Sequence, residues 1–313
     1  MSNQDLFATV REQRPLVHCI TNYVTAGDVA NMILAAGASP VMADGRREAE
    51  EITRLSRALV LNIGTLQEAA VESMLAAGKL AAGLGHPVVF DPVGAGASTF
   101  RTETALRIVR EIPCTVIRGN ASEIRTIARG MAADSGNPSA VRPVSSHGVD
   151  ADEREKITKE NRQRTAETLK ELSRKTGAVI VMTGETDLVA DGKQACMIKN
   201  GHPMMARITG TGCMMDGVIA AALAVSDPEE RFENVVYAAA AYGLCGELAW
   251  ERMEQMERAE RTERTRRPAE TDGGSGRCSG EAIGGTGSFR MYFFDAMSRL
   301  EDRQVQKGAR YEA

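Results

Sequence analysis

Aromatic residues are scarce in this sequence, since Phe, Trp and Tyr together supply only 4% of its 313 residues. A folded core must therefore be built mainly from aliphatic side chains and from the 15 Met. Positive charge is not in excess either, because the formal net charge is -4. This charge balance gives no reason to expect a nucleic-acid partner.

Long apolar runs and closely paired cysteines are also missing. No stretch reaches the roughly 18 uninterrupted apolar residues that a membrane-spanning helix needs. The N-terminal segment MSNQDLFATVREQRP contains no apolar run of the kind found in a secretion signal. The six Cys are widely spaced, which argues against a disulfide scaffold or a zinc site and favours a reducing interior. Together these absences predict a cytoplasmic protein with no membrane partner.

Short β-like runs alternate with helical runs along most of the chain. Several β-like runs are continuously apolar, such as Ala178–Met182, which is typical of a strand buried on both faces. The predicted strands are Leu16–Thr21, Ser39–Val41, Ala58–Asn62, Pro87–Asp91, Thr115–Arg118, Ala178–Thr183, Asp187–Ala190 and Gln194–Ile198. The predicted helices are Gly27–Ala36, Leu66–Gly83, Thr102–Arg110, Ser122–Gly130, Ala166–Thr176, Gly212–Val225 and Phe232–Glu254. This order predicts an α/β fold with a central, mainly parallel sheet flanked by helices, in a single domain over residues 1–313.

Two tracts differ in composition from the rest of the chain. Residues 145–175 are strongly charged, and their later part reads as an exposed helix that ends just before Gly177. Residues 252–283 pass from a charged helical extension into a Gly/Ser-rich stretch. We interpret the second tract as a surface insertion, and solvated surface as the main role of both tracts.

A Gly-rich turn, Gly210–Cys213, leads directly into an apolar helix. Glycine lets a ligand approach the backbone closely, and the free N–H groups of a first helical turn bind anions such as a transferring phosphoryl group. Simple helix entry explains such a turn equally well. The Cys213 thiol at this position is either a reactive group or a small buried side chain. For Asp216, three residues later, we favour a first-turn carboxylate that interacts with the helix dipole.

Polar residues stand at the carboxyl ends of other predicted strands, where ligands of parallel sheets bind. Asp91 suits Mg²⁺ or a substrate hydroxyl, and otherwise caps the following turn. Arg118 suits a phosphate clamp. Glu123 suits Mg²⁺, although Asn120 and Glu123 also fit a variant of the helix capping box.

Three further strand ends carry weaker signals. Thr183 suits a nucleotide phosphate or a simple turn. Met42 alone is ordinary core. His18 alone is more often a hydrogen-bonded structural histidine than a base.

Taken in order, eight segments resemble those of the hydroxyethylthiazole kinase family. The resemblance covers most of residues 14–250 and again about 284–301. Each segment alone is moderately specific, whereas all of them in the right order are very specific. The segments are VHCITNYVT, SPVMA, LNIGTL, VFDPVGAGAS, IRGNASEI, VMTGETD, NGHPMMARITGTGC and GTGSFRMYFFDAMSRL.

The resemblance implies a ribokinase-like fold and a homotrimer with active sites between subunits. It implies ATP-dependent phosphorylation of the hydroxyethyl group of 4-methyl-5-(2-hydroxyethyl)thiazole in thiamine salvage. Cys213 falls where many ribokinase-like proteins place a catalytic Asp. By similarity, the site residues are Met42, Gly210 and Asn22 for the thiazole, Arg118 and Thr183 for ATP, and Asp91 and Glu123 for Mg²⁺.

A thiolate is a weak base for a primary alcohol, but phosphoryl transfer through a loose transition state needs little early deprotonation. We therefore expect the backbone N–H groups of the turn, with Gly210 and Gly212, to supply most of the catalysis. In this hypothesis Mg²⁺ assists the in-line transfer, and Cys213 accepts the substrate proton late.

The sequence departs from the family pattern at two places. Asp216 occupies a position where a small residue is expected, and the 252–283 tract is longer than the corresponding region. Three rival functions remain open. The chain could phosphorylate another alcohol such as a hydroxymethylpyrimidine, or it could be a silent binding module with the same fold. A Rossmann oxidoreductase is the weakest rival, because no GxGxxG follows the first strand.

Overall fold

The computed structural model describes residues 5–133, 161–266 and 284–312, and its centre is one nine-stranded sheet. The strand order is β2-β1-β3-β4-β5-β6-β7-β8-β9. Pairing is parallel from β2 through β6 and antiparallel from β6 through β9. The strands are β1 (Leu16–Ile20), β2 (Ser39–Met42), β3 (Ala58–Asn62), β4 (Val88–Asp91), β5 (Val116–Asn120), β6 (Val179–Thr183), β7 (Asp187–Ala190), β8 (Ala195–Ile198) and β9 (Tyr311–Glu312). The prediction of a mainly parallel central sheet is confirmed.

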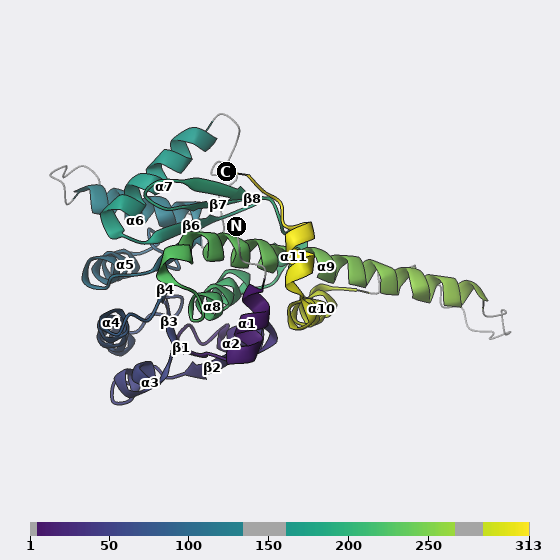
Figure 1. Ribbon diagram of the computed structural model, residues 1–313, viewed down its shortest axis with the longest axis horizontal. Coiled ribbons are helices and arrows are strands. Elements are labelled where there is room, and N and C mark those ends of the chain that lie inside the picture. Colours follow the sequence, from purple (N-terminus) through teal and green to yellow (C-terminus); the bar gives the residue numbers. More distant parts are fainter. Residues whose placement is uncertain (1–4, 134–160, 267–283, 313) are drawn as a thin grey trace.

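Helices cover both faces of this sheet (Figure 1). One face carries α3 (Ala49–Leu55), α4 (Glu68–Gly83), α5 (Thr99–Glu111), α6 (Ala121–Ala133) and α7 (Arg162–Thr176). The other carries α1 (Leu6–Gln13), α2 (Ala26–Ala36), α8 (Thr211–Leu223), α9 (Arg231–Arg266), α10 (Thr286–Arg299) and α11 (Asp302–Gly308). Short 3-10 helices lie at Pro203–Arg207 and Pro228–Glu230. Among the residues that the structure describes, no helix is both long enough and apolar enough to span a membrane.

The apolar strands are buried on both faces because successive side chains point to opposite sides. In β3, Leu59 and Leu61 join the cluster beneath α4 and α5, whereas Val60 joins the cluster beneath α8. Each face therefore has its own core, and the sheet separates the two. This arrangement explains why the strands read as continuous apolar runs rather than as alternating ones.

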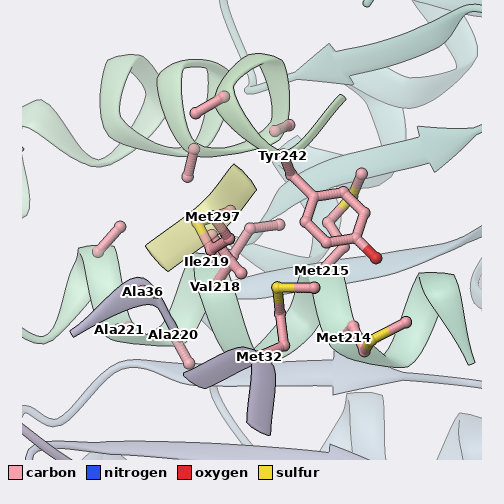
Figure 2. Packing of buried hydrophobic residues seen from close by; sticks show 14 of the residues in the cluster. Met32, Ala36, Met214, Met215, Val218, Ile219, Ala220, Ala221, Tyr242 and Met297 are labelled. Atoms are coloured by element: carbon pink, nitrogen blue, oxygen red, sulfur yellow. The ribbon is translucent and has the colours of Figure 1, made fainter. Parts of the chain in front are cut away.

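Methionines fill much of the core around α8, where the sequence is poor in aromatic residues (Figure 2). Met214, Met215 and Met32 are all buried there. A large ring at this place is that of Tyr242 of α9, whose hydroxyl donates a 2.6 Å hydrogen bond to the Thr211 carbonyl. This bond holds the first residue of α8 against α9, so α9 fixes the position of the start of α8.

A buried carboxylate joins the two ends of the chain. Asp302 accepts hydrogen bonds from the backbone N–H groups of Phe7 at 3.1 Å and Ala8 at 2.9 Å. It also accepts one from the Tyr237 hydroxyl at 2.9 Å. The start of α1 is thus capped by a residue from the far end of the sequence.

The structure contains elements that the sequence patterns did not predict, namely α1, α3, α10, α11 and β9. The charged helical extension expected at the start of the 252–283 tract is confirmed, because α9 continues to Arg266 and projects away from the sheet (Figure 1). The expected end of α7 is confirmed, because Gly177 follows it with φ 74. The rest of the two charged tracts, residues 145–160 and 267–283, lies outside the described residues.

Candidate active site

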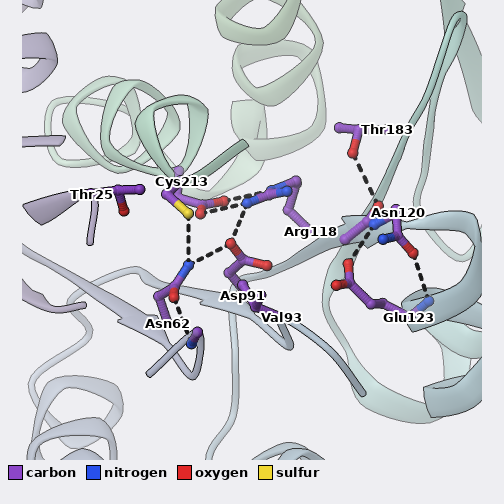
Figure 3. A network of polar contacts seen from close by, with 12 residues as sticks. Thr25, Asn62, Asp91, Val93, Arg118, Asn120, Glu123, Thr183 and Cys213 are labelled. Atoms are coloured by element: carbon purple, nitrogen blue, oxygen red, sulfur yellow. Dashed lines mark hydrogen bonds and ion pairs between the residues drawn. The ribbon is translucent and has the colours of Figure 1, made fainter. Parts of the chain in front are cut away.

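Four parallel strands deliver polar residues to one edge of the sheet. Asn62 ends β3 directly beside Asp91, which ends β4. Asn120 ends β5 directly beside Thr183, which ends β6. The N-terminus of α8 comes down on this edge, and Figure 3 shows the resulting network around Cys213. The site therefore forms where the carboxyl ends of parallel strands meet a helix start.

The turn before α8 needs glycine at its first position. Gly210 has φ 83, in the left-handed region that side chains disfavour. A Cβ at Gly210 would lie 2.5 Å from Thr25 Cγ2. Thr25 is itself fixed, since its N–H and its hydroxyl both donate to Asn22 Oδ1, at 3.0 and 2.9 Å. The close approach between Gly210 and Thr25 joins the α8 turn to the start of α2.

Two amide side chains hold the sulfur of Cys213. Asn62 Nδ2 donates to Cys213 Sγ at 3.2 Å, and Asn22 Nδ2 does so at 3.4 Å. The Gly64 backbone N–H, which can only donate, binds Asn62 Oδ1 at 2.9 Å and so fixes the orientation of that amide. Asn62 Nδ2 also donates to Asp91 Oδ2 at 2.6 Å. The sulfur thus accepts hydrogen bonds from two N–H donors.

Arg118 lies buried beneath the same turn. Its Nε and Nη2 donate to the two carboxylate oxygens of Asp216, both at 2.8 Å. Nη2 also pairs with Asp91 Oδ2. Its remaining nitrogen, Nη1, lies against Gly212, where an added Cβ would come within 2.4 Å of it. The expectation that Asp216 is a first-turn carboxylate serving the helix dipole is wrong, because Asp216 lies beyond the first turn of α8 and is fully buried in an ion pair with Arg118.

Asp91 has one carboxylate oxygen that takes no part in the hydrogen bonds of this network. It is fully buried, and its Oδ1 has no hydrogen-bond partner among the described residues. Burial raises the pKa of Asp91 well above its usual value, against the opposing charge of Arg118. The nearby charge of Asp216 raises this pKa further. A buried, unpartnered carboxylate oxygen is costly to folding, which points to a ligand at this atom.

Asn120 and Glu123 form the capping box that the sequence left as an alternative. The Glu123 N–H donates to Asn120 Oδ1 at 2.9 Å, and the Asn120 N–H donates to Glu123 Oε2 at 2.7 Å. Glu123 Oε1 also accepts the Gly94 N–H at 2.8 Å. Burial raises the pKa of Glu123, and its bonds to Gly94 and Asn120 oppose that rise. Glu123 therefore ties the loop after β4 to the start of α6 beside Asp91.

The other predicted site residues lie at the margin of this network. Thr183 donates to the Gly119 carbonyl at 3.3 Å. Met42 ends the edge strand β2 and is 38% exposed. His18 is buried, with Nε2 2.7 Å from the Ala43 carbonyl and Nδ1 2.9 Å from the Thr53 hydroxyl. His18 is thus a hydrogen-bonded structural histidine, and it fixes the segment that follows Met42.

The turn after β6 contains a titrating carboxyl group. Asp187 accepts the Gly184 N–H at 2.9 Å, and burial raises the pKa of Asp187 to about 7. The folded state then holds this proton more tightly than the unfolded chain, so stability falls as the pH rises from about 4 through about 7. We expect Asp187→Asn, which keeps an acceptor for Gly184, to stabilise the protein by about 2–4 kcal/mol more at pH 8 than at pH 4. Urea unfolding at the two pH values measures this difference.

The control for this prediction is Asp295→Asn, a substitution at an exposed aspartate of α10. We expect its effect on the free energy of unfolding to be the same at both pH values. An equally flat response of Asp187→Asn would show that Asp187 carries no such proton.

Sequence patterns missed two members of the network, Asn62 and Asp216 in its paired role. The position of Asn62 at the end of an apolar strand, in the LNIGTL segment, could have identified it as a site residue. The apolar sequence around Asp216 could have indicated its paired role, because a lone carboxylate in an otherwise apolar helix has to be buried with a partner. Neither signal names the partner, which depends on the order of the strands.

Sequence comparison places the chain among known proteins. The sequence model of the Hydroxyethylthiazole kinase family matches residues 7–262. A hydroxyethylthiazole kinase from Desulfovibrio desulfuricans is 44% identical over 297 residues, which is 95% of this chain and 93% of that protein. One from Clostridium acetobutylicum is 41% identical over 304 residues, 97% of each chain.

Structural comparison agrees. The solved hydroxyethylthiazole kinase protein from Pyrococcus horikoshii superposes with a TM-score of 0.74 and 30% identity, over 100% of this chain and 99% of that chain. Pyridoxal kinase from Staphylococcus aureus, solved with ADP, shares the fold at a TM-score of 0.50 and 13% identity, over 72% of this chain and 85% of that chain. The fold is ribokinase-like, as expected. The match of family model, relatives and structure over most of the length shows that this chain belongs to the hydroxyethylthiazole kinase family.

Proposed function

We propose that this chain transfers the γ-phosphate of ATP to the hydroxyethyl group of 4-methyl-5-(2-hydroxyethyl)thiazole. The observation that carries the proposal is the convergence of the α8 turn, the Arg118 guanidinium and the unpartnered Asp91 Oδ1 at one edge of the sheet. Membership of the family supplies the class of acceptor alcohol.

The α8 turn binds the transferring phosphoryl group. The first N–H groups of a helix have no partner within the helix, and the helix dipole favours an anion there. Tyr242 anchors Thr211, and Thr25 packs against Gly210, so these donors are fixed before substrate arrives. Fixed donors stabilise developing charge without reorganisation in the transition state.

Arg118 contributes positive charge beneath this turn. Asp216 and Asp91 bind Nε and Nη2, and Nη1 lies beside Gly212. The guanidinium therefore faces the same phosphate that the helix start binds. We assign Thr183, one strand away, to the ATP phosphates as well.

Mg²⁺ fits the unpartnered oxygen of Asp91. Hard cations prefer oxygen ligands, and Mg²⁺ usually binds one or two carboxylates together with waters and substrate phosphates. No group of three or more His, Cys, Asp or Glu that could hold a metal occurs in the described part of the chain. When bound, Mg²⁺ neutralises charge on the ATP phosphates. Asp91 would hold the ion, and Glu123 would lie next to it and fix the Gly94 loop.

Cys213 acts as a weak base in this proposal. Its sulfur receives N–H donors from Asn22 and Asn62, so it is held as an acceptor near the substrate hydroxyl. A loose transition state needs the proton to leave only late, so a weak base is sufficient. We assign Met42 and the Gly210 backbone to the thiazole ring. Asn22 lies nearby and acts mainly through Cys213, because its amide is already engaged.

We also propose a homotrimer with active sites between subunits, in which exposed apolar residues beside the site form a subunit contact. Tyr23 is 74% exposed and Val24 61% exposed, directly after Asn22. Exposed apolar side chains next to a binding site suit a subunit contact.

The decisive assay measures phosphorylated alcohol formed from Mg·ATP with hydroxyethylthiazole and, separately, with hydroxymethylpyrimidine. We expect turnover with the thiazole alcohol and much less with the pyrimidine. Preference for the pyrimidine would assign a different acceptor. Absence of phosphorylated product from either alcohol would reject the kinase proposal.

The role of Cys213 has its own prediction. We expect Cys213→Ala to lower kcat by about a hundredfold, the low end of the roughly 10²–10⁴-fold that general-base catalysis contributes, because a thiol is a weak base for an alcohol. Cys213→Asp supplies a carboxylate at the same place and is expected to retain or exceed the wild-type kcat. Full kcat in Cys213→Ala, with an unchanged pH profile, would remove Cys213 from the mechanism.

A further inference from the structure

Asp216 has no role in the proposed chemistry, yet it is fully buried and makes two hydrogen bonds to Arg118. We propose that Asp216 is a positioning residue that holds Arg118 in one orientation, so that Asp91 keeps one oxygen for Mg²⁺. This inference rests on the proposed function only in naming Mg²⁺ as the occupant. It follows from how three buried side chains share their hydrogen bonds.

The guanidinium of Arg118 divides its donors between two carboxylates. The edge formed by Nε and Nη2 faces Asp216 and makes a bidentate pair, which fixes the plane of a rigid group. Asp91 accepts a bond from Arg118 only at Oδ2 and only from Nη2, and Asn62 Nδ2 donates to the same oxygen. In this orientation Nη1 lies beside Gly212 and makes no hydrogen bond to Asp91 Oδ1.

Without Asp216 the same guanidinium has a better arrangement available. Asp91 is the other buried carboxylate that it contacts, and a bidentate pair is the strongest contact that Arg and a carboxylate make. Rotation into that pair would occupy Asp91 Oδ1 and draw Nη1 away from the turn. Asp216 therefore prevents a tight Arg118–Asp91 pair that would compete with a cation.

The charges agree with this role. Two carboxylates face one guanidinium, and Glu123 lies close enough to act electrostatically on Asp91. This cluster contains more carboxyl groups than guanidinium groups, so a divalent cation at Asp91 Oδ1 would balance their charge once they are ionised. If Asp216 served only to bury Arg118, its removal would weaken folding but would not change the availability of Asp91.

The test measures metal binding separately from turnover. Mn²⁺ is titrated into wild type and Asp216→Ala by electron paramagnetic resonance, with a saturating non-hydrolysable ATP analogue. We expect Asp216→Ala to weaken Mn²⁺ binding about tenfold or more, as loss of a group that orients a metal ligand does. In the assay, kcat should fall about a hundredfold while the KM for the alcohol changes less than about twofold. Asp216→Asn keeps an acceptor oxygen, so its Mn²⁺ affinity and its kcat should lie between those of wild type and Asp216→Ala. This variant replaces Asp216→Ala if Asp216→Ala does not fold.

A double variant separates positioning from simple structural support. If Arg118 blocks Asp91 once Asp216 is gone, then Asp216→Ala combined with Arg118→Met should bind Mn²⁺ more tightly than Asp216→Ala alone, although turnover stays lost. Unchanged Mn²⁺ affinity in folded Asp216→Ala, or no recovery in the double variant, would overturn the proposal. Asp295→Asn serves as the surface control.

A different experimental result would refute the proposed function without refuting the role of Asp216. A wild-type protein that binds Mn²⁺ and nucleotide but phosphorylates no thiazole alcohol would refute the substrate assignment. The Mn²⁺ measurements would still decide whether Asp216 positions Arg118.

Discussion

Gly212→Ala should lower kcat about a hundredfold to a thousandfold, because it removes the contact between Arg118 and the phosphate-binding turn. A Cβ on Gly212 would lie 2.4 Å from Arg118 Nη1 and 3.0 Å from Cζ. Arg118 cannot simply move aside, since Asp216 and Asp91 hold its other nitrogens. The guanidinium or the helix start must therefore shift at the place where the phosphoryl group binds. Steady-state kinetics with the thiazole alcohol measures the effect.

The matched control is Gly287→Ala in α10, where nothing lies within 4 Å of the added Cβ. We expect that variant to keep the wild-type kcat. A Gly212→Ala enzyme with kcat within about threefold of wild type would mean that the turn and Arg118 do not act together on the phosphate.

Asp91→Asn should abolish most turnover and yet stabilise the folded protein. The substitution removes the carboxylate whose Oδ1 is kept free, and we expect kcat to fall about a thousandfold. Burial raises the pKa of Asp91 well above its usual value, so the ionised carboxylate is costly to the folded state near neutral pH. Asparagine has a similar shape and removes that cost, so the thermal unfolding midpoint should rise. Enzyme kinetics and calorimetry on one preparation measure the two effects.

Asp302→Asn provides a control with the opposite expectation. Asp302 is also buried, but all of its contacts are structural, with Phe7, Ala8 and Tyr237. Asparagine has one acceptor oxygen, so this variant should lose about 1–3 kcal/mol of stability while its kcat is retained. If Asp91→Asn instead lost stability in step with activity, Asp91 would be a structural residue like Asp302.

Much of the fold followed from local patterns in the sequence. Strands such as Ala58–Asn62 were recognisable because a central parallel strand is apolar on both faces. The capping box at Asn120 and Glu123 was also local, with partners three residues apart. Two of the missed helices, α3 and α11, are only 7 residues long, and α1 depends on Asp302 from the other end of the chain.

The candidate site was only partly predictable, because its parts come from separate strand ends. The sequence pointed to Asp91, Arg118 and Cys213 as individual residues. It did not show that Asn62 lies beside Asp91, since that contact requires β3 and β4 to be neighbours. It also could not show that the pair Arg118–Asp216 joins β5 to α8. These contacts depend on strand order and helix docking, which the patterns of single elements do not contain.

The central claim is that the phosphoryl group passes directly from ATP to the alcohol while bound at the start of α8. The most direct test is the stereochemistry at phosphorus, measured with ATP whose γ-phosphorus is made chiral by sulfur and oxygen isotopes. A single in-line transfer inverts the configuration, and inversion is the result we predict. Net retention would require a second transfer, through a phosphorylated side chain such as Cys213, and would contradict the account.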